Sequence, residues 1–437
     1  MFMEKRMQSR QTLLSLVLLV VLAVFTGTAS AGPLDDYVAK PEEVYAWQVV
    51  QSIPTPDGAT IHQLGLTSQV WQGITWRHRL YVVMPAQPKY ATAVLYITGS
   101  GSGEDEIAFM GALANQLAAP VAILFDIPNQ PLFNNLNEDH LIAYTFVRFA
   151  ETGDPTWPVL LPMTKGAVKA MDAVIEFAAS KQINIKDFVV AGGSKRGWTT
   201  WLSAAVDKRV RAIAPVAYDN LNLAAQMQRQ VEVFGTFSEE ISEYTTLDLP
   251  QLLATEEGRF LADLVDPYAY VDRFTMPKLI VRGTNDPYWP HDGVNLYLND
   301  LPGNTWIHYD PNGGHAPNDL KRVLATVAGF YLHSVGALPL APIKWQVQEG
   351  DTSVQLTVQA PLPAPKITWW WADSLTMDFR NAVWTEGTTA SGLTRTITID
   401  RPFVGYKAFY GELVYTIGDI PVVLNTPVYT ISAAGKP

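Results

Sequence analysis

Residues 188–198 read FVVAGGSKRGW, and this stretch decides which fold we expect. An apolar run typical of a buried strand ends in Gly192, Gly193 and Ser194, and a helical pattern begins at once. A strand that turns directly into a helix presents the serine at the tip of the turn, where its hydroxyl can act as a nucleophile. The first amides of the helix point to the same place and would stabilise an oxyanion.

The turn departs from the usual pattern Gly-x-Ser-x-Gly. Arg196 stands where the second glycine is expected, and Gly197 follows one position later. An ordinary strand-to-helix turn in which Ser194 caps the helix would also fit these residues. The turn alone therefore leaves both interpretations open.

Two later segments supply partners for the serine. Residues 279–287 read as a buried strand followed by a loop that carries Asp286, and residues 307–317 read as a strand followed by a glycine-rich loop that carries His315. Asp286 could instead be a simple turn residue before a proline. The order serine, acid, histidine is nevertheless the order in which folds with a serine at such a strand-to-helix turn provide a catalytic triad. We predict that Ser194 is the nucleophile, with His315 as its base and Asp286 orienting the imidazole.

An oxyanion hole is expected near the same turn. The backbone amide of Lys195 would supply one donor, and an amide of Gly99 or Ser100 the other, because residues 98–103 (TGSGSG) form a glycine-rich loop after an early strand. A glycine-rich loop also suggests phosphate binding. This loop lacks the Gly-Lys-Ser/Thr ending of a nucleotide-binding loop.

Two cations directly follow the predicted nucleophile. Lys195 and Arg196 could stabilise developing negative charge or select substrates that bear a carboxylate. The alternative is that both are solvated residues at a helix start. Tyr288, two positions after Asp286, is a further candidate for substrate contact.

The rest of the first 340 residues fits an α/β fold. Residues 45–84 alternate in the manner of antiparallel strands, whereas the later apolar runs are short and continuous, as in a sheet covered on both faces. The continuous runs are residues 93–98, 121–125, 188–191, 212–217, 278–282 and 306–309. Helical patterns between them, clearest at 165–179, predict a doubly wound, mostly parallel sheet over residues 32–340. We interpret residues 220–265 as a helical cap inserted between two strands.

A second domain is predicted at residues 341–437. The helical pattern ends near residue 340, and short strands rich in Trp, Thr and Val follow, which is typical of a β-sandwich. The run Trp369-Trp370-Trp371 could form a glycan or cell-surface contact if alternate rings are exposed, or it could pack within and between the domains.

The N-terminus predicts export. Residues 1–31 contain three basic residues, an apolar run of thirteen residues and an Ala-Ser-Ala site, which is the pattern of a cleaved signal peptide; a membrane anchor is the alternative. Cleavage removes those three basic residues and Glu4, which changes the net charge from −11 to −13 and disfavours nucleic-acid binding. The absence of cysteine excludes disulfides and thiolate chemistry. We expect a periplasmic or secreted protein with no membrane span after cleavage.

Several segments together resemble the PhoPQ-activated pathogenicity-related family of bacterial proteins. They are residues 34–38 (LDDYV), 127–132 (IPNQPL), 193–198 (GSKRGW), 283–289 (GTNDPYW) and 378–380 (DFR). The resemblance implies an exported protein with an α/β-hydrolase core, associated with envelope stress and virulence programmes, and it implies that Arg196 after the serine is normal in this family. It does not supply a substrate.

We therefore expect a serine hydrolase that cleaves a small ester or peptide without a metal or other cofactor. A metal hydrolase built on His291, Asp292, His308, Asp310 and His315 is one alternative, although no tight ligand motif is present. The other is a non-catalytic binding or adhesion protein that retains the fold.

Overall fold

The computed structural model describes residues 32–360, 366–417 and 420–433, and the predicted signal peptide at 1–31 lies outside these ranges. The first part of the chain forms α2 (Pro33–Ala39), β1 (Ala46–Pro54), β2 (Thr60–Trp71), β3 (Ile74–Met84), β4 (Thr92–Ile97), α3 (Glu104–Leu117), β5 (Val121–Leu124), α4 (Glu138–Thr152), α5 (Leu160–Ser180), β6 (Asp187–Gly193), α6 (Lys195–Val206), β7 (Val210–Val216), β8 (Lys278–Gly283), β9 (Thr305–Asp310) and α11 (Leu320–Ser334). Short 3-10 turns, η2 (Pro267–Arg273), η3 (Gly293–Leu296) and η4 (Leu298–Asp300), flank β8.

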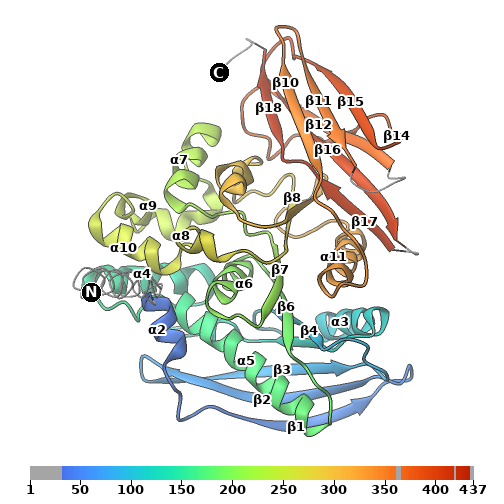
Figure 1. Cartoon of the computed structure of the whole chain (residues 1–437). Coiled ribbons are helices and arrows are strands. Elements are labelled where there is room, and N and C mark those ends of the chain that lie inside the picture. Colours follow the sequence, from blue (N-terminus) through green and yellow to red (C-terminus); the bar gives the residue numbers. More distant parts are fainter. Residues whose placement is uncertain (1–31, 361–365, 418–419, 434–437) are drawn as a thin grey trace, which may run out of the picture.

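These strands lie in the order β1-β2-β3-β5-β4-β6-β7-β8-β9. The pairs from β5 to β9 are parallel, and β1, β2 and β3 pair in an antiparallel manner. β5 lies between β3 and β4 in the sheet, so the strand order reverses at this point, and helices connect the parallel strands. Both are features of a doubly wound sheet. The predicted α/β-hydrolase fold is confirmed (Figure 1).

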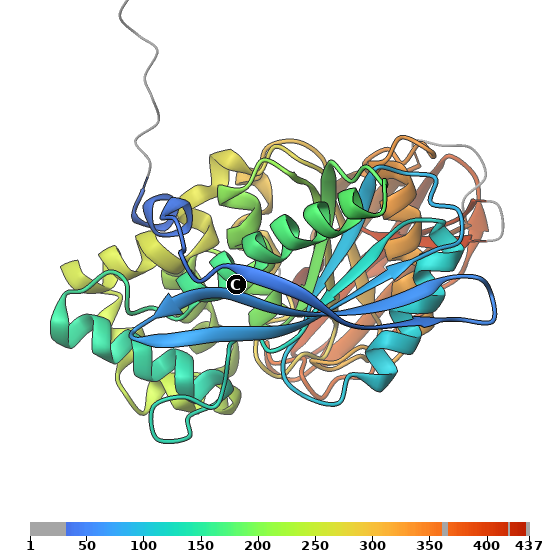
Figure 2. The same cartoon turned by 90° about the horizontal axis from the view of Figure 1, so that it is seen from below.

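Helices cover both faces of the sheet (Figure 2). Along β6, Phe188 and Val190 belong to the core cluster shared with α5 and α6, while Val189 and Ala191 belong to the cluster shared with α3 and α11. Because successive side chains of a strand point to opposite faces, a strand buried on both sides reads as a continuous apolar run. That is why these short runs identified the strands.

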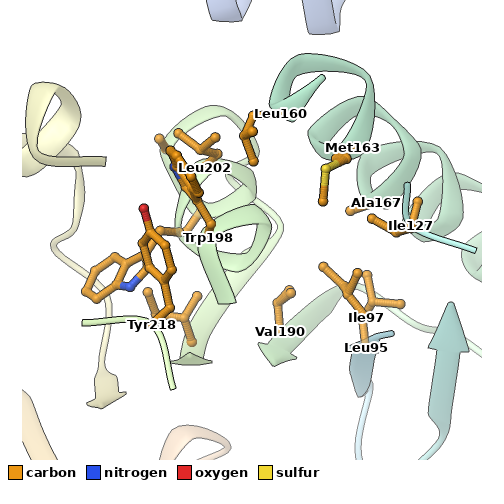
Figure 3. Close-up of a cluster of buried hydrophobic side chains, with 14 of the residues drawn as sticks. Leu95, Ile97, Ile127, Leu160, Met163, Ala167, Val190, Trp198, Leu202 and Tyr218 are labelled. Carbon is orange, nitrogen blue, oxygen red and sulfur yellow. The ribbon is translucent and has the colours of Figure 1, made fainter. Parts of the chain in front are cut away.

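The long helix α5 differs from its predicted range. We predicted residues 165–179, and the helix begins five residues earlier, at Leu160. Pro162 lies in its first turn, where a missing amide hydrogen costs nothing because the first amides have no partner within the helix. Figure 3 shows how Leu160, Met163 and Ala167 of this helix pack beside α6 and above β4 and β6.

A helical insertion separates β7 from β8, as predicted. It contains α7 (Leu223–Phe234), η1 (Glu239–Ile241), α8 (Ser242–Thr245), α9 (Leu249–Leu252) and α10 (Glu256–Val265). Figure 1 shows these helices gathered to one side of the sheet, next to α4. We call residues 220–265 the insertion.

The last part of the chain is built from two packed sheets. One consists of β10 (Lys344–Glu349), β11 (Ser353–Gln359) and β15 (Thr394–Asp400), and the other contains β12 (Lys366–Ser374), β13 (Thr385–Glu386), β14 (Ala390–Ser391), β16 (Tyr406–Ile417), β17 (Ile420–Asn425) and β18 (Tyr429–Ser432). Side chains from both sheets share one core, so the predicted β-sandwich is confirmed. The second sheet also meets the α/β sheet, because Asn425 of β17 pairs with Ile307 of β9.

Candidate active site

Ser194 lies at the sharp turn between β6 and α6. Its backbone has φ 55° and ψ −126°, a conformation that costs energy for a residue with a side chain and is typical of a nucleophile held at a strained turn. The Ser194 amide donates to Val216 O at 2.8 Å, which ties the turn to the neighbouring strand.

The glycines around this turn allow close packing. A Cβ at Gly192 would approach Arg196 O at 2.6 Å, and a Cβ at Gly197 would approach Tyr218 Cβ at 2.8 Å. Gly197 thus permits the contact between α6 and the chain after β7, one position later than the usual pattern places its second glycine. Nearby, Trp198 and Tyr218 stack with ring centroids 5.1 Å apart (Figure 3).

The structure brings the three predicted catalytic side chains together. His315 Nε2 lies 2.8 Å from Ser194 Oγ, and His315 Nδ1 lies 2.9 Å from Asp286 Oδ2. The Asp286 side chain is 1% exposed and the His315 side chain 25% exposed. A buried carboxylate next to an imidazole that reaches solvent and a serine hydroxyl is the arrangement that activates a serine.

The loop after β8, residues 284–292, holds this arrangement in place, and we call it the acid loop. Asp286 Oδ1 accepts a hydrogen bond from the Tyr288 amide at 2.9 Å, which fixes the carboxylate. The Tyr288 ring packs over the His315 ring at a centroid distance of 4.1 Å. Burial, with nearby carboxylates such as Asp139, raises the pKa of Tyr288 to about 12, so its hydroxyl stays neutral at ordinary pH.

A buried ion pair, Arg282 with Asp219, contacts the acid loop. Arg282 and Asp219 are each 1% exposed at the side chain and form a salt bridge, and Tyr297 donates to Asp219 at 2.6 Å. Arg282 also donates to Pro290 O at 2.9 Å, in the loop that follows Asp286. Breaking such a buried pair would leave an uncompensated charge beneath the site.

The predicted oxyanion loop lies against the turn. A Cβ at Gly99 would approach the Arg196 guanidinium at 2.5 Å, and Gly99 O accepts a hydrogen bond from the Asp126 amide at 3.0 Å. Lys195 is the first residue of α6, with its amide at the N-terminal end of the helix. Ser100 follows Gly99 in the same loop.

The two cations after Ser194 are paired with carboxylates. Lys195 Nζ lies 3.0 Å from Glu138 and 2.8 Å from Asp139. Arg196 forms two hydrogen bonds of 2.7 Å to Glu138 and donates to Ile127 O at 2.6 Å. Both cations are 9% exposed, so they are not solvated residues at a helix start.

The pKa of Glu138 reflects this pairing. Burial raises the pKa of its carboxyl, but the hydrogen bonds and charge of Arg196, with the charge of Lys195, outweigh burial and lower the pKa to about 2. Glu138 and Asp139 were not among the site residues predicted from the sequence. The available signal was the acidic pair at the start of a helical pattern.

A cavity opens beside Ser194, beneath the insertion. It is lined by α4, α6, the insertion and the acid loop, including Tyr288. Its walls are predominantly apolar and aromatic. Such a cavity with a few polar groups at one end is the usual form of a small-molecule site.

The residues of the metal alternative do not gather. His308 lies within β9, where its Nδ1 is 3.1 Å from Val423 O, and His291 Nε2 is 2.7 Å from Thr430 Oγ1. Burial lowers the pKa of each to about 4. Over the ranges that the structure describes, no group of three or more His, Asp or Glu side chains is placed to hold a metal ion.

The tryptophan run divides between two faces of β12. Trp369 and Trp371 stack at 6.4 Å and pack against the core of the sandwich, whereas Trp370 donates to Glu412 at 3.1 Å and packs against the α/β unit. All three rings are half-buried.

Within the part of the chain that the structure describes, none of the helices has the length and apolar character needed to span a bilayer.

The strand order, the insertion and the strand-to-helix turn define an α/β-hydrolase fold with a Ser-His-Asp arrangement. The chain belongs to the PhoPQ-activated pathogenicity-related protein family, whose model matches residues 34–380. This confirms the resemblance noted from the sequence.

One relative and two solved structures illustrate the similarity. The Dictyostelium discoideum autocrine proliferation repressor protein A is 30% identical over 92% of this chain and 90% of its own. An acetyl xylan esterase from Paenibacillus sp. R4 is 15% identical (TM-score 0.48; 68% of this chain and 90% of that chain). A puromycin-hydrolyzing peptidase from Mycobacterium tuberculosis is also 15% identical (TM-score 0.42; 70% and 49%).

Proposed function

We propose that the protein is an exported serine hydrolase that cleaves an ester or amide bond through an acyl-enzyme on Ser194. The observation that carries the proposal is the continuous hydrogen-bonded path from Ser194 Oγ through His315 to the buried Asp286 carboxylate, at a strained turn. Export is supported by the pattern of residues 1–31.

We propose the following reaction for these three residues. His315 Nε2 accepts the hydroxyl proton as Ser194 Oγ attacks the carbonyl carbon, and Asp286 stabilises the imidazolium that forms. His315 then gives the proton to the departing alcohol or amine as the C–O or C–N bond breaks. A water molecule attacks the acyl-serine, with His315 again as base, and releases the acid.

The negatively charged oxygen of each tetrahedral intermediate needs hydrogen-bond donors to stabilise it. The Lys195 amide at the start of α6 is one proposed donor, and an amide of Gly99 or Ser100 is the second. The Lys195 and Arg196 side chains already serve Glu138 and Asp139. We therefore propose that these two cations join the turn, the Gly99 loop and α4, rather than binding a substrate carboxylate.

Turnover by purified protein tests the proposal. Wild type should hydrolyse members of a panel of p-nitrophenyl esters and peptide p-nitroanilides, and the Ser194→Ala variant should hydrolyse none above background. Equal rates for wild type and the Ser194→Ala variant would refute the proposal.

A second candidate is a non-catalytic signal or binding protein. The observation that favours it is the name of the Dictyostelium relative, which describes an autocrine repressor of proliferation rather than an enzyme. If folded wild type hydrolyses nothing and Ser194 shows no reactivity, this candidate takes precedence.

A further inference from the structure

The side chains that line the cavity beside Ser194 indicate what kind of substrate it accepts. This inference rests on the proposed function. Its walls beneath the insertion include Phe146, Trp198, Leu223, Leu253, Leu261 and Val265. The only charged side chains among its described lining residues are Asp139 and Lys195, which form an ion pair with each other at 2.8 Å.

Ser194 lines the cavity, and so does Tyr288, whose ring packs over that of His315, but His315 itself is not among the described lining residues. Because the leaving group takes its proton from His315, that group must lie next to the imidazole. The acyl group attached to the same carbonyl then extends into the cavity.

We propose that this cavity binds the acyl group of the substrate and that this group is uncharged and predominantly apolar. A carboxylate placed here would lose its hydration without gaining a free cation, because Lys195 is shared by Glu138 and Asp139.

Two esters of similar length test the acyl preference. We expect kcat/KM for p-nitrophenyl pentanoate to exceed that for mono-p-nitrophenyl succinate by at least about tenfold, since a carboxylate has to be desolvated in the cavity. The Leu253→Lys variant, with a cation in the wall, should reduce this ratio about tenfold. Leu247→Lys is the matched control, because Leu247 lies on the same insertion but is 47% exposed and outside this lining.

Reactivity towards a fluorophosphonate separates the two ways in which this test can fail. If the probe labels Ser194 but wild type prefers the succinate ester or does not discriminate, the acyl inference is wrong and the hydrolase proposal stands. If wild type neither reacts with the probe nor hydrolyses either ester, the hydrolase proposal fails and the acyl inference fails with it.

A different set of contacts connects the β-sandwich to the catalytic loops. Asn285, which precedes Asp286, donates its side-chain amide to Arg380 O at 3.0 Å and Ala382 O at 2.7 Å. Asn312, in the loop that carries His315, donates to Trp384 O at 3.0 Å and accepts from the Trp384 amide at 2.7 Å.

Two aromatic side chains anchor the contacted segment, residues 379–384, in the protein interior. Phe379 and Trp384 are 1% and 2% exposed, and the Phe379 ring packs against His291 at 4.5 Å. From the same segment, Arg380 reaches the insertion, where it pairs with Glu239 at 3.0 Å and lies over the Phe234 ring. One short segment thus contacts the acid loop, the histidine loop and the insertion.

We infer that Asn285 and Asn312 are positioning residues through which the β-sandwich aligns Asp286 and His315. This inference also rests on the proposed function. A side chain that makes several hydrogen bonds to a rigid segment restricts its loop, and a misplacement of about 1 Å between catalytic groups can cost about a hundredfold in rate.

The test compares Asn285→Ala and Asn312→Ala with Asn295→Ala. Asn295 donates to Val428 O at 2.8 Å, so its removal breaks the same kind of contact with the sandwich away from the catalytic loops. We expect the first two variants to lower kcat at least about tenfold with KM within twofold, and Asn295→Ala to keep both constants close to wild type. Melting temperatures verify that each variant is folded.

The outcomes are distinct. If wild type turns over and both loop variants match Asn295→Ala in kcat, the positioning role is refuted. If one loop variant does not fold, the other still decides. A wild type without any activity would instead remove the proposed function.

Discussion

Two regions flank Ser194, and they are built from different side chains. On one side, His315 and Asp286 are fixed by hydrogen bonds that run from strand ends into a buried ion pair and into the β-sandwich. On the other side, the cavity is enclosed by apolar side chains from helices of the insertion. Hydrogen bonds depend on direction, whereas apolar contacts tolerate changes of shape. We therefore expect the first region to determine rate and the second to determine substrate choice.

The largest effect should follow removal of the base. His315→Ala should lower kcat by about 10⁶-fold, since the serine hydroxyl then has no group to accept its proton. KM and melting temperature should change little. Steady-state kinetics on the best ester of the panel measures this, and a variant that retains a tenth of the activity would contradict the role of His315 as the base.

Removal of the acid's charge should have a smaller effect. Asp286→Asn keeps an oxygen for the Tyr288 amide but no longer stabilises the imidazolium, so kcat should fall about 10⁴-fold. Full activity in this variant would mean that His315 is oriented by something other than Asp286.

Loss of the Arg282–Asp219 ion pair next to the acid loop should mainly lower the stability of the protein. Arg282→Met leaves Asp219 buried without its partner and should lower the free energy of unfolding by about 3–5 kcal/mol. Urea denaturation measures this loss. Adding Asp219→Asn to that variant should recover part of it, because the unpaired charge is removed; no recovery would show that the loss has another source.

On the cavity side, a change should act on substrate binding. Met227→Ala removes part of the wall and should raise KM for p-nitrophenyl pentanoate by roughly fivefold while kcat stays within about twofold. Leu247→Ala, an exposed change on the same insertion, is the control. A fall in kcat with constant KM would contradict the division between the two regions.

The smallest effect concerns acid stability. Because the pKa of Glu138 is lowered to about 2 in the folded protein, its contribution to stability is fully present above about pH 4.5 and is lost as the pH falls towards 2. The difference in melting temperature between wild type and Glu138→Gln should therefore be greatest near neutral pH and shrink below pH 4.5. A constant difference across this range would contradict the assigned pKa.

Much of the fold could be read from the sequence, because local patterns carry it. The doubly buried strands are continuous apolar runs, and the turn at Ser194 combines a strand end, glycines and a helix start within a few residues. The candidate catalytic residues could be ordered in the same way, since each follows a strand end.

The remaining features depend on contacts between distant segments. Arg196 meets Glu138, 58 residues away, and nothing near either residue identifies the other. Asn285 lay within a recognised motif, yet its partners belong to the sandwich, 95 to 97 residues further on. The role of these residues follows from how the segments pack, which no local pattern encodes.

Covalent labelling with a fluorophosphonate, located by peptide mass spectrometry, tests the central claim most directly. We expect one phosphonyl group per wild-type molecule, attached to Ser194, with labelling that is lost in Ser194→Ala and strongly slowed in His315→Ala. Folded wild type that stays unlabelled, or a label on another serine, would contradict an activated Ser194.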